Sequence, residues 1–193
     1  MPMHFAVLYG SMRRDRQGIR AARFITRQVE DRGHKATLVD ALEHPLPLLD
    51  RMYKEYPKGQ APEVMENLAQ LYRSVDGFLI VSGEYNHGIP AALKNLLDHF
   101  LEEYFFRPSG IVCYSAGPWG GVRAAMQLRM TLAELGMPSI SSLLPIPQVQ
   151  NQFAEDGTPR DESWARRAGR FLADLEWWAE AAQQQRALKA PPY

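Results

Sequence analysis

The sequence predicts a doubly wound α/β domain built on a five-stranded parallel sheet. Short apolar runs alternate along the chain with longer segments whose apolar residues recur at helical spacing. Because parallel strands need crossover connections and helices supply them, this alternation is typical of a sheet covered on both faces. The sequence contains no internal repeat and no long linker, so we expect residues 1–193 to form a single domain.

The expected elements follow one another in a regular order. In the first part of the chain we expect strands at 4–9, 35–40 and 77–82, with helices at 19–29 and 62–74. The next helix is predicted to begin at Pro90, a residue favoured in the first helical position, and carries an apolar stripe. After it we expect a strand at 110–115, a helix at 122–135, a short strand at 139–143 and a last helix at 161–187.

Composition excludes some classes of function. Lys plus Arg and Asp plus Glu each number 22, so the formal net charge is zero and nothing draws the whole chain to nucleic acid or lipid. The single cysteine, Cys113, lies in an apolar run and fits a buried thiol in a reducing compartment better than a catalytic one. Since no segment reaches the roughly 20 apolar residues of a membrane span, we expect a cytoplasmic chain without membrane insertion.

The charge is unevenly distributed along the chain. Residues 1–39 carry eight basic and three acidic side chains, whereas residues 40–103 carry five and eleven. The excess of positive charge lies directly after the first predicted strand, where four arginines gather: Arg13, Arg14, Arg16 and Arg20.

The loop that follows the first strand is the first candidate site, because ligands of open α/β sheets bind at the carboxyl ends of the strands. Residues 10–18 offer hydroxyl, guanidinium and glycine groups at the start of a helix, which suits a phosphate. They match neither G-x-G-x-x-G nor the nucleoside triphosphate loop, which favours a mononucleotide such as FMN. A solvated basic loop with Asp15 as a helix cap explains this segment equally well.

Two later loops complete the candidate site. In GEYNHGIP at 83–90, the backbone amides, the Asn86 side chain and the face of Tyr85 can line a planar heterocycle, while His87 alone fits a structural loop residue better. In SAGPWGGVR at 115–123, three glycines allow a close approach to a flat ligand. The alternative for this loop is a tight turn with Trp119 as a surface anchor.

Together these segments resemble the NADPH-dependent FMN reductase family, flavodoxin-like proteins that include quinone, azo-dye and chromate reductases. GSMR at 10–13, GEYNHGIPAALKNLLDHF at 83–100 and SAGPWGGVRAAMQLR at 115–129 carry the resemblance, which extends from residue 4 to about residue 160. It implies a flavodoxin-like three-layer sandwich with strand order 2-1-3-4-5 and a noncovalently bound FMN. It also implies hydride transfer from NADPH or NADH to a small-molecule acceptor such as free flavin, a quinone, an azo compound or a metal oxyanion.

The resemblance assigns roles to individual residues. The FMN phosphate is expected at Ser11, Arg13, Arg16, Gln17 and Gly18. The isoalloxazine ring is expected to contact Glu84, Tyr85, Asn86 and His87 on one side, and Ser115, Gly117, Trp119, Gly120 and Gly121 on the other. Tyr85 and Trp119 are candidates for stacking, Arg123 is a candidate for a cofactor phosphate, and no protein nucleophile or metal is expected.

Some positions depart from the family pattern. Gly83 stands where many relatives have Pro, and Arg16 and Gly18 stand where a small polar residue and Asn are common. The first change loosens the turn before the ring, and the second replaces neutral phosphate donors with a cation. Two alternatives to a reductase remain open: a flavodoxin-like electron carrier that does not react with NAD(P)H, and a flavin supplier to a partner monooxygenase.

Assembly and cleft shape give further expectations. The last helix and the helix after Pro90 carry much apolar surface: Trp164, Phe171, Leu175, Trp177 and Trp178 on the former, and Leu93, Leu97 and Leu101 on the latter. The resemblance therefore implies a homodimer or tetramer whose second subunit closes the flavin cleft, while packing of the last helix on its own sheet explains that helix equally well. The loops at 48–60 and 104–108 are expected to line part of the cleft.

Overall fold

The computed structural model describes residues 2–192 and contains a five-stranded sheet in the order β2-β1-β3-β4-β5. The strands are β1 (His4–Tyr9), β2 (Lys35–Asp40), β3 (Gly77–Ser82), β4 (Ser109–Tyr114) and β5 (Ser139–Ile146). The helices are α1 (Ile19–Asp31), α2 (Glu63–Ser74), α3 (Ala91–Asp98), α4 (Val122–Glu134) and α5 (Ser163–Leu188). All neighbouring strands are parallel, and their order is the predicted 2-1-3-4-5, which is confirmed.

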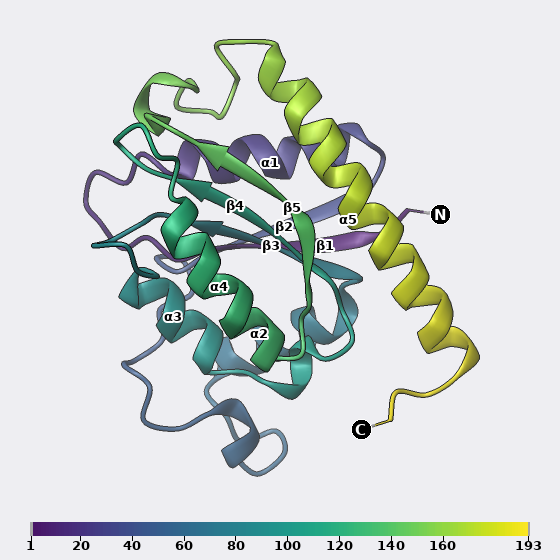
Figure 1. Ribbon diagram of the computed structural model, residues 1–193. Coiled ribbons are helices and arrows are strands. Elements are labelled where there is room, and N and C mark those ends of the chain that lie inside the picture. Colours follow the sequence, from purple (N-terminus) through teal and green to yellow (C-terminus); the bar gives the residue numbers. More distant parts are fainter. Residues whose placement is uncertain (1, 193) are drawn as a thin grey trace.

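Helices cover both faces of the sheet and give the predicted three layers (Figure 1). The helices α1 and α5 pack on one face, and α2, α3 and α4 pack on the other. The central strand β1 is buried on both sides: Phe5 and Val7 face the α1 and α5 layer, while Ala6 and Leu8 face the opposite layer. This explains why β1 reads as a continuous apolar run rather than as an alternating one.

Two elements differ most from the prediction, and the others differ by no more than two residues at either end. The strand β5 continues through Pro145 to Ile146, because it pairs only with β4 and an edge strand tolerates a proline that lacks an N–H group. The helix α3 ends at Asp98, well before Leu101, and Pro90 is its N-cap rather than its first helical residue. A short 3-10 helix, η2 (Glu102–Tyr104), follows and turns the chain toward β4.

Most of the apolar surface that suggested assembly is used within the chain. Leu93 and Leu97 are buried in the core beneath α3. On α5, Phe171 is likewise buried against the sheet, together with Trp164 and Leu175. Of the α5 residues that suggested assembly, the two later tryptophans remain exposed, Trp177 at 63% and Trp178 at 51%.

The loops expected to line part of the cleft lie elsewhere. Residues 104–108 directly precede β4, so they stand at the amino end of the sheet, where Phe106 and Pro108 border a groove beside α5. Residues 53, 54 and 56–59 line a separate polar cavity with side chains of α2 and η2. The expectation is wrong for 104–108 because these residues precede a strand, and it is wrong for 48–60 because that loop, although it follows β2, lines the cavity beside α2 instead of the cleft.

Across residues 2–192, no helix combines the length and the apolar character that crossing a bilayer requires.

Candidate functional site

A cavity of about 440 Å³ opens at the carboxyl ends of β1, β3 and β4. Residues of all three predicted loops line it: Ser11, Arg13, Arg16, Gln17, Gly18, Glu84, Tyr85 and Ser115. Its wall also contains residues that the sequence did not single out for the site: Asp15, Gly83, Tyr114, Ala116, Val149 and Gln150. The three loops meet because parallel strands end at the same edge of the sheet.

The loop after β1 has many unused hydrogen-bond donors. Within the described residues, no backbone N–H from Ser11 to Gly18 donates to a protein acceptor. Asp15 does not cap α1: its carboxylate accepts a hydrogen bond from Gln17 Nε2 at 2.9 Å, and the N-cap position is taken by Gly18. A loop of free amides at a helix N-terminus is an anion site.

The arginines of this loop differ in what they contact. The guanidinium of Arg16 forms an ion pair with Asp40, a buried carboxylate at the end of β2. Arg20 donates to the backbone carbonyls of residues 150 and 153. Arg13 and Arg14 are exposed and have no ion-pair partner among residues 2–192, and only Arg13 lines the cavity. The cation available to a bound anion is therefore Arg13, and Arg16 serves mainly to hold the loop to β2.

Glu84, expected at the ring, makes its contacts with α4. Its Oε2 accepts hydrogen bonds from the backbone N–H groups of Arg123 at 3.0 Å and Ala124 at 3.1 Å. Gly121, the N-cap of α4, has no side chain to cap the helix, so a carboxylate from the neighbouring loop satisfies these amides. The Arg123 guanidinium lies 3.7 Å from Glu84 and 5.2 Å from the Trp119 ring, which leaves it tied to these groups rather than free for a phosphate.

Residues 85–88 form a tight turn at the rim. Tyr85 and Gly88 exchange two backbone hydrogen bonds of 3.1 and 2.9 Å, and Asn86 and His87 between them both have positive φ, 49° and 66°. These are the angles of a type I′ turn. Asn86 lines a second hollow, beside the cavity, together with Arg13, Glu84 and Tyr85. His87 lines neither space, and its carbonyl accepts a hydrogen bond from Gln127.

The loop after β4 is closed by its own hydrogen bonds. The Ser115 hydroxyl donates to the carbonyl of Gly117 at 2.8 Å and accepts from the N–H of Gly120 at 2.8 Å. Gly120 and Gly121 have φ of 65° and 78°, in the left-handed region that favours glycine. Of the predicted residues in this loop, only Ser115 lines the cavity, while Trp119 is 64% exposed. The glycines here shape the turn and do not form the cavity wall.

Two tyrosines lie at the strand ends, and one of them, Tyr114, lines the cavity. The rings of Tyr9 and Tyr114 lie 6.4 Å apart, and burial raises the pKa of both, so both hydroxyls keep their protons. A Cβ atom on Gly18 would stand 2.1 Å from the Tyr114 ring, and one on Gly83 would stand 3.1 Å from it. Both departures from the family pattern therefore make room for Tyr114.

Gln150 is one of the cavity residues that sequence reasoning missed. It lies in the 3-10 helix η3 (Val149–Asn151), just after β5, and its Nε2 donates to the carbonyl of Ala116 at 3.2 Å. Its Oε1 is buried and has no hydrogen-bond partner among the described residues, and the same is true of the Tyr9 hydroxyl. A polar residue just after the carboxyl end of a strand is a candidate for the site. Gln150 was not recognised as one because the predicted strand ended at residue 143, whereas β5 extends to Ile146.

The chain is similar to a protein family and to individual relatives in it. The family model of NADPH-dependent FMN reductase matches residues 3–151. The chain is 28% identical over 172 residues to the NAD(P)H-dependent FMN reductase LOT6 of Saccharomyces cerevisiae, covering 82% of this chain and 88% of the relative. It is 26% identical over 156 residues to an NADPH azoreductase of a Bacillus species, covering 80% and 83%.

The fold is shared with solved flavoproteins. The NAD(P)H:acceptor oxidoreductase FerB of Paracoccus denitrificans superposes with a TM-score of 0.71 at 23% identity, covering 92% of this chain and 98% of FerB. An archaeal flavodoxin superposes with a TM-score of 0.57 at 12% identity, covering 94% of this chain and 99% of the flavodoxin. The flavodoxin-like fold is confirmed. Because the family model covers most of its length, the chain belongs to the NADPH-dependent FMN reductase family, as an oxidoreductase that uses FMN and NAD(P)H.

Proposed function

We propose that the cavity at the ends of β1, β3 and β4 binds FMN, and that its phosphate is held by the loop after β1. The observation that carries this proposal is the run of unpartnered amides from Ser11 to Gly18 at the start of α1, with the exposed cation Arg13 beside it. The N-terminus of α4, at the same edge, already holds the Glu84 carboxylate, so it has no place for a second anion. The donor set therefore fits one phosphate, in one place.

The remaining residues of the cavity fit the less polar part of the cofactor. Tyr85 presents a ring that is 42% exposed, and Ser115 and Ala116 belong to the loop on the far side. The buried Gln150 Oε1 has no protein donor, so a small movement of this side chain would let it accept a hydrogen bond from a ligand. Tyr85 and the two loops would position the ring, since aromatic faces and close backbone suit a planar heterocycle.

When bound, FMN supplies the ability to accept a hydride and pass electrons on, and the protein contributes position and electrostatics. The second hollow shares Arg13, Glu84 and Tyr85 with the cavity and adds Asn86. We infer that NAD(P)H and then a small acceptor, such as a quinone or an azo compound, use this hollow in turn. No side chain of the protein needs to form a covalent bond with either partner.

Assembly and location are part of the same proposal. We propose a homodimer or tetramer, supported by the two exposed tryptophans of α5. A cytoplasmic location is supported by the use of a single, buried cysteine, which suits a reducing compartment.

An absorbance spectrum of the purified protein, recorded before and after anaerobic addition of NADPH and then NADH, tests the proposed function. We expect flavin bands that bleach, and the nucleotide that bleaches them faster is the preferred donor. A colourless protein that fails to bind added FMN would overturn the proposal. Flavin bands that neither nucleotide bleaches would instead favour an electron carrier, and steady-state NADPH oxidation with a quinone would then be absent as well.

A further inference from the structure

Tyr114, the last residue of β4, reaches across the end of β3 to the start of α1. By the register of the two strands, Tyr114 lies level with Gly83, the residue that follows β3. A Cβ atom on Gly83 would stand 3.1 Å from the Tyr114 hydroxyl, and one on Gly18, the N-cap of α1, would overlap it. The two glycines therefore leave the path along which the tyrosine brings its hydroxyl to the N-terminus of α1.

The Tyr114 hydroxyl stands at the wall of the cavity. Gly18 and Gly83, which flank it, both line the cavity, and so does Tyr114 itself. Its ring packs on the α1 and α5 core, 6.4 Å from the ring of Tyr9, so the core fixes the position of the hydroxyl. Burial raises the pKa of Tyr114 and keeps the proton on its oxygen, whereas the neighbouring Ser11 hydroxyl lowers that pKa. The phenol is thus a preorganised neutral donor close to Ser11.

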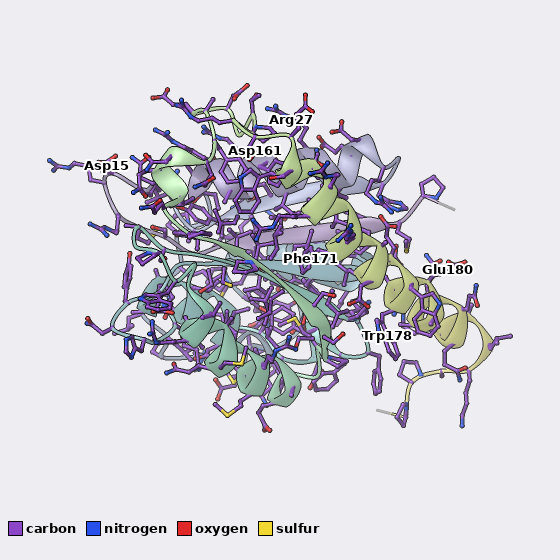
Figure 2. The ribbon with its side chains drawn as sticks, turned by 45° about the horizontal axis from the view of Figure 1, so that its top comes forward. Asp15, Arg27, Asp161, Phe171, Trp178 and Glu180 are labelled. Atoms are coloured by element: carbon purple, nitrogen blue, oxygen red, sulfur yellow. The ribbon has the colours of Figure 1, made fainter. Side chains whose placement is uncertain are left out.

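The loop after β1 has buried ends and an exposed middle. Ser11 and Gly18 are buried, whereas Asp15 between them is exposed. Figure 2 shows Asp15 at the outer end of the molecule, opposite Trp178 on α5. The Tyr114 hydroxyl lies beside both buried ends of the loop. An anion held by the free amides of this loop would therefore meet the hydroxyl on its inner side.

The loop offers a phosphate little positive charge. Among residues 2–192, the arginines of the cavity wall are Arg13 and Arg16, and Arg16 is paired with Asp40. A phosphate monoester carries a charge of about −1.5 to −2 at pH 7, and its oxygens accept several hydrogen bonds. Neutral donors therefore have to complete its binding. A hydrogen bond from a hydroxyl to an ionised oxygen is short and about twice as strong as one between neutral groups.

We propose that the Tyr114 hydroxyl donates a hydrogen bond to the phosphate of bound FMN, beside the free amides of the loop after β1. This inference rests on the proposed FMN site and adds to it a phosphate donor from β4, which is separated from β1 by β3. Riboflavin has the same ring and the same ribityl chain as FMN but no phosphate, so it cannot make this contact. The Tyr114 hydroxyl therefore selects for the phosphorylated flavin.

Tyr9 supplies a matched comparison on the neighbouring side of the sheet. It also ends a strand, and burial raises its pKa as well. Its hydroxyl is buried without a hydrogen-bond partner among the described residues, and Tyr9 does not line the cavity. Removing this hydroxyl breaks no hydrogen bond, so Tyr9→Phe should fold and bind as the wild type does.

Paired flavin titrations test the proposal. Apoproteins of the wild type, Tyr114→Phe and Tyr9→Phe are titrated with FMN and with riboflavin, flavin fluorescence gives each dissociation constant, and circular dichroism checks folding. We expect Tyr114→Phe to raise the dissociation constant for FMN about tenfold and that for riboflavin less than about twofold. Tyr9→Phe should change both less than about twofold. A purely structural role of the Tyr114 hydroxyl would weaken both flavins alike, so the ratio of the two constants is the decisive readout.

The phosphorus resonance of FMN, recorded with the protein in saturating excess, gives a second readout that needs no riboflavin. We expect its chemical shift to differ between the wild type and Tyr114→Phe, and to be the same in the wild type and Tyr9→Phe. An unchanged FMN dissociation constant and resonance in Tyr114→Phe, an equal loss of both flavins, or an equal loss in Tyr9→Phe would overturn the inference. The proposed function survives each of these results. A wild type that binds neither flavin would instead overturn the proposed function, and this inference with it.

Discussion

Two loops at the same edge of the sheet, Gly10–Gly18 after β1 and Ser115–Gly121 after β4, look alike in sequence and differ in chemistry. Each contains glycine, follows a buried strand and leads into a helix. In the β1 loop, the amides from Ser11 to Gly18 have no protein acceptor among the described residues. In the β4 loop, the Ser115 hydroxyl and the Glu84 carboxylate satisfy amides of the turn and of the helix start.

The difference shows that glycine content does not distinguish a binding loop from a turn. What distinguishes them is whether the polar groups are satisfied within the protein, because an unpaired amide near a cavity is costly unless water or a ligand pairs with it. The β1 loop is built to receive an anion, and the β4 loop is built to keep its shape. The following predictions test this difference between the two loops.

The largest effect is expected when a glycine of the β4 loop is replaced. Gly121 has a φ of 78°, and a Cβ atom there would stand 2.7 Å from the backbone oxygen of Tyr114. We expect Gly121→Ala to lower the free energy of unfolding by about 2 to 4 kcal/mol, because strain and a clash with backbone add. Gly117→Ala, with nothing within 4 Å of its Cβ, is the matched control and should stay within about 0.5 kcal/mol. Urea unfolding measures both, and equal losses would mean that the β4 loop is not rigid.

A smaller effect, on binding rather than folding, is expected in the β1 loop. Arg13→Ala should weaken FMN binding by about 10- to 100-fold, since a charged hydrogen bond contributes about 1.5 to 3 kcal/mol. Flavin fluorescence during titration of the apoprotein gives the dissociation constant. Arg14→Ala removes the same charge from the same loop at a residue outside the cavity wall, so it should have little effect.

Comparing these two variants distinguishes a direct contact between Arg13 and the phosphate from attraction by the net charge of the loop. If Arg14→Ala weakened binding as much as Arg13→Ala, the loop would act only through its net charge. If neither variant retained less flavin than the wild type, the phosphate would not lie at this loop.

The sequence predicted the fold well because its signals are local. Buried strands such as β1 and β3 read as apolar runs, and their predicted bounds match the structure. The strand order was an implication of the family resemblance rather than of periodicity. The strand β5 was predicted to end three residues too early. It contains Pro145, which usually ends a strand, but β5 lies at the edge of the sheet, where a proline is tolerated.

The site was less predictable because its decisive contacts join residues far apart in the chain. Arg16 pairs with Asp40 and Glu84 pairs with amides of α4, and neither partnership can be read from composition or spacing. Both residues were therefore predicted as ligand contacts, although their charged groups are used to fix loops. Gly18 was predicted as part of the phosphate loop and does line the cavity, but its second role, leaving room for the ring of Tyr114, could not be read from the sequence.

A third prediction concerns the N-terminus of α4, whose free amides Glu84 caps. Glu84→Ala should lower the free energy of unfolding by about 1 to 2 kcal/mol, the range seen when a helix loses its cap. Glu84→Gln keeps an oxygen acceptor for the amides of Arg123 and Ala124 but loses the charge, so we expect roughly half of that cost. Thermal unfolding of the two variants measures the difference. A stability equal to that of the wild type in both would show that water caps this helix equally well.

The last prediction concerns β4, the strand that leads into the β4 loop. Its effect on stability is the smallest at neutral pH and becomes measurable only in alkaline solution. Cys113 on β4 is fully buried, and burial raises the pKa of its thiol from 9.0 to about 12. The unfolded chain then loses this proton at a lower pH than the folded one. Stability from the neutral buried thiol is therefore complete below about pH 9 and falls as the pH rises toward 12, by about 1.4 kcal/mol per pH unit.

Replacing the thiol isolates its contribution to the free energy of unfolding. This control is needed because other buried groups also lower that free energy at alkaline pH. Tyr9 and Tyr114 have pKa values raised by burial, so the wild type and Cys113→Ala should both lose stability in alkali. The variant starts lower, since it leaves a small cavity, but the gap between the two should narrow as the pH rises from about 8 to about 10. Urea unfolding at each pH measures the gap. If the free energies of unfolding of the two proteins fell in parallel with pH, the thiol would have the same pKa in the folded and the unfolded chain. The end of β4 next to the β4 loop would then be open to solvent.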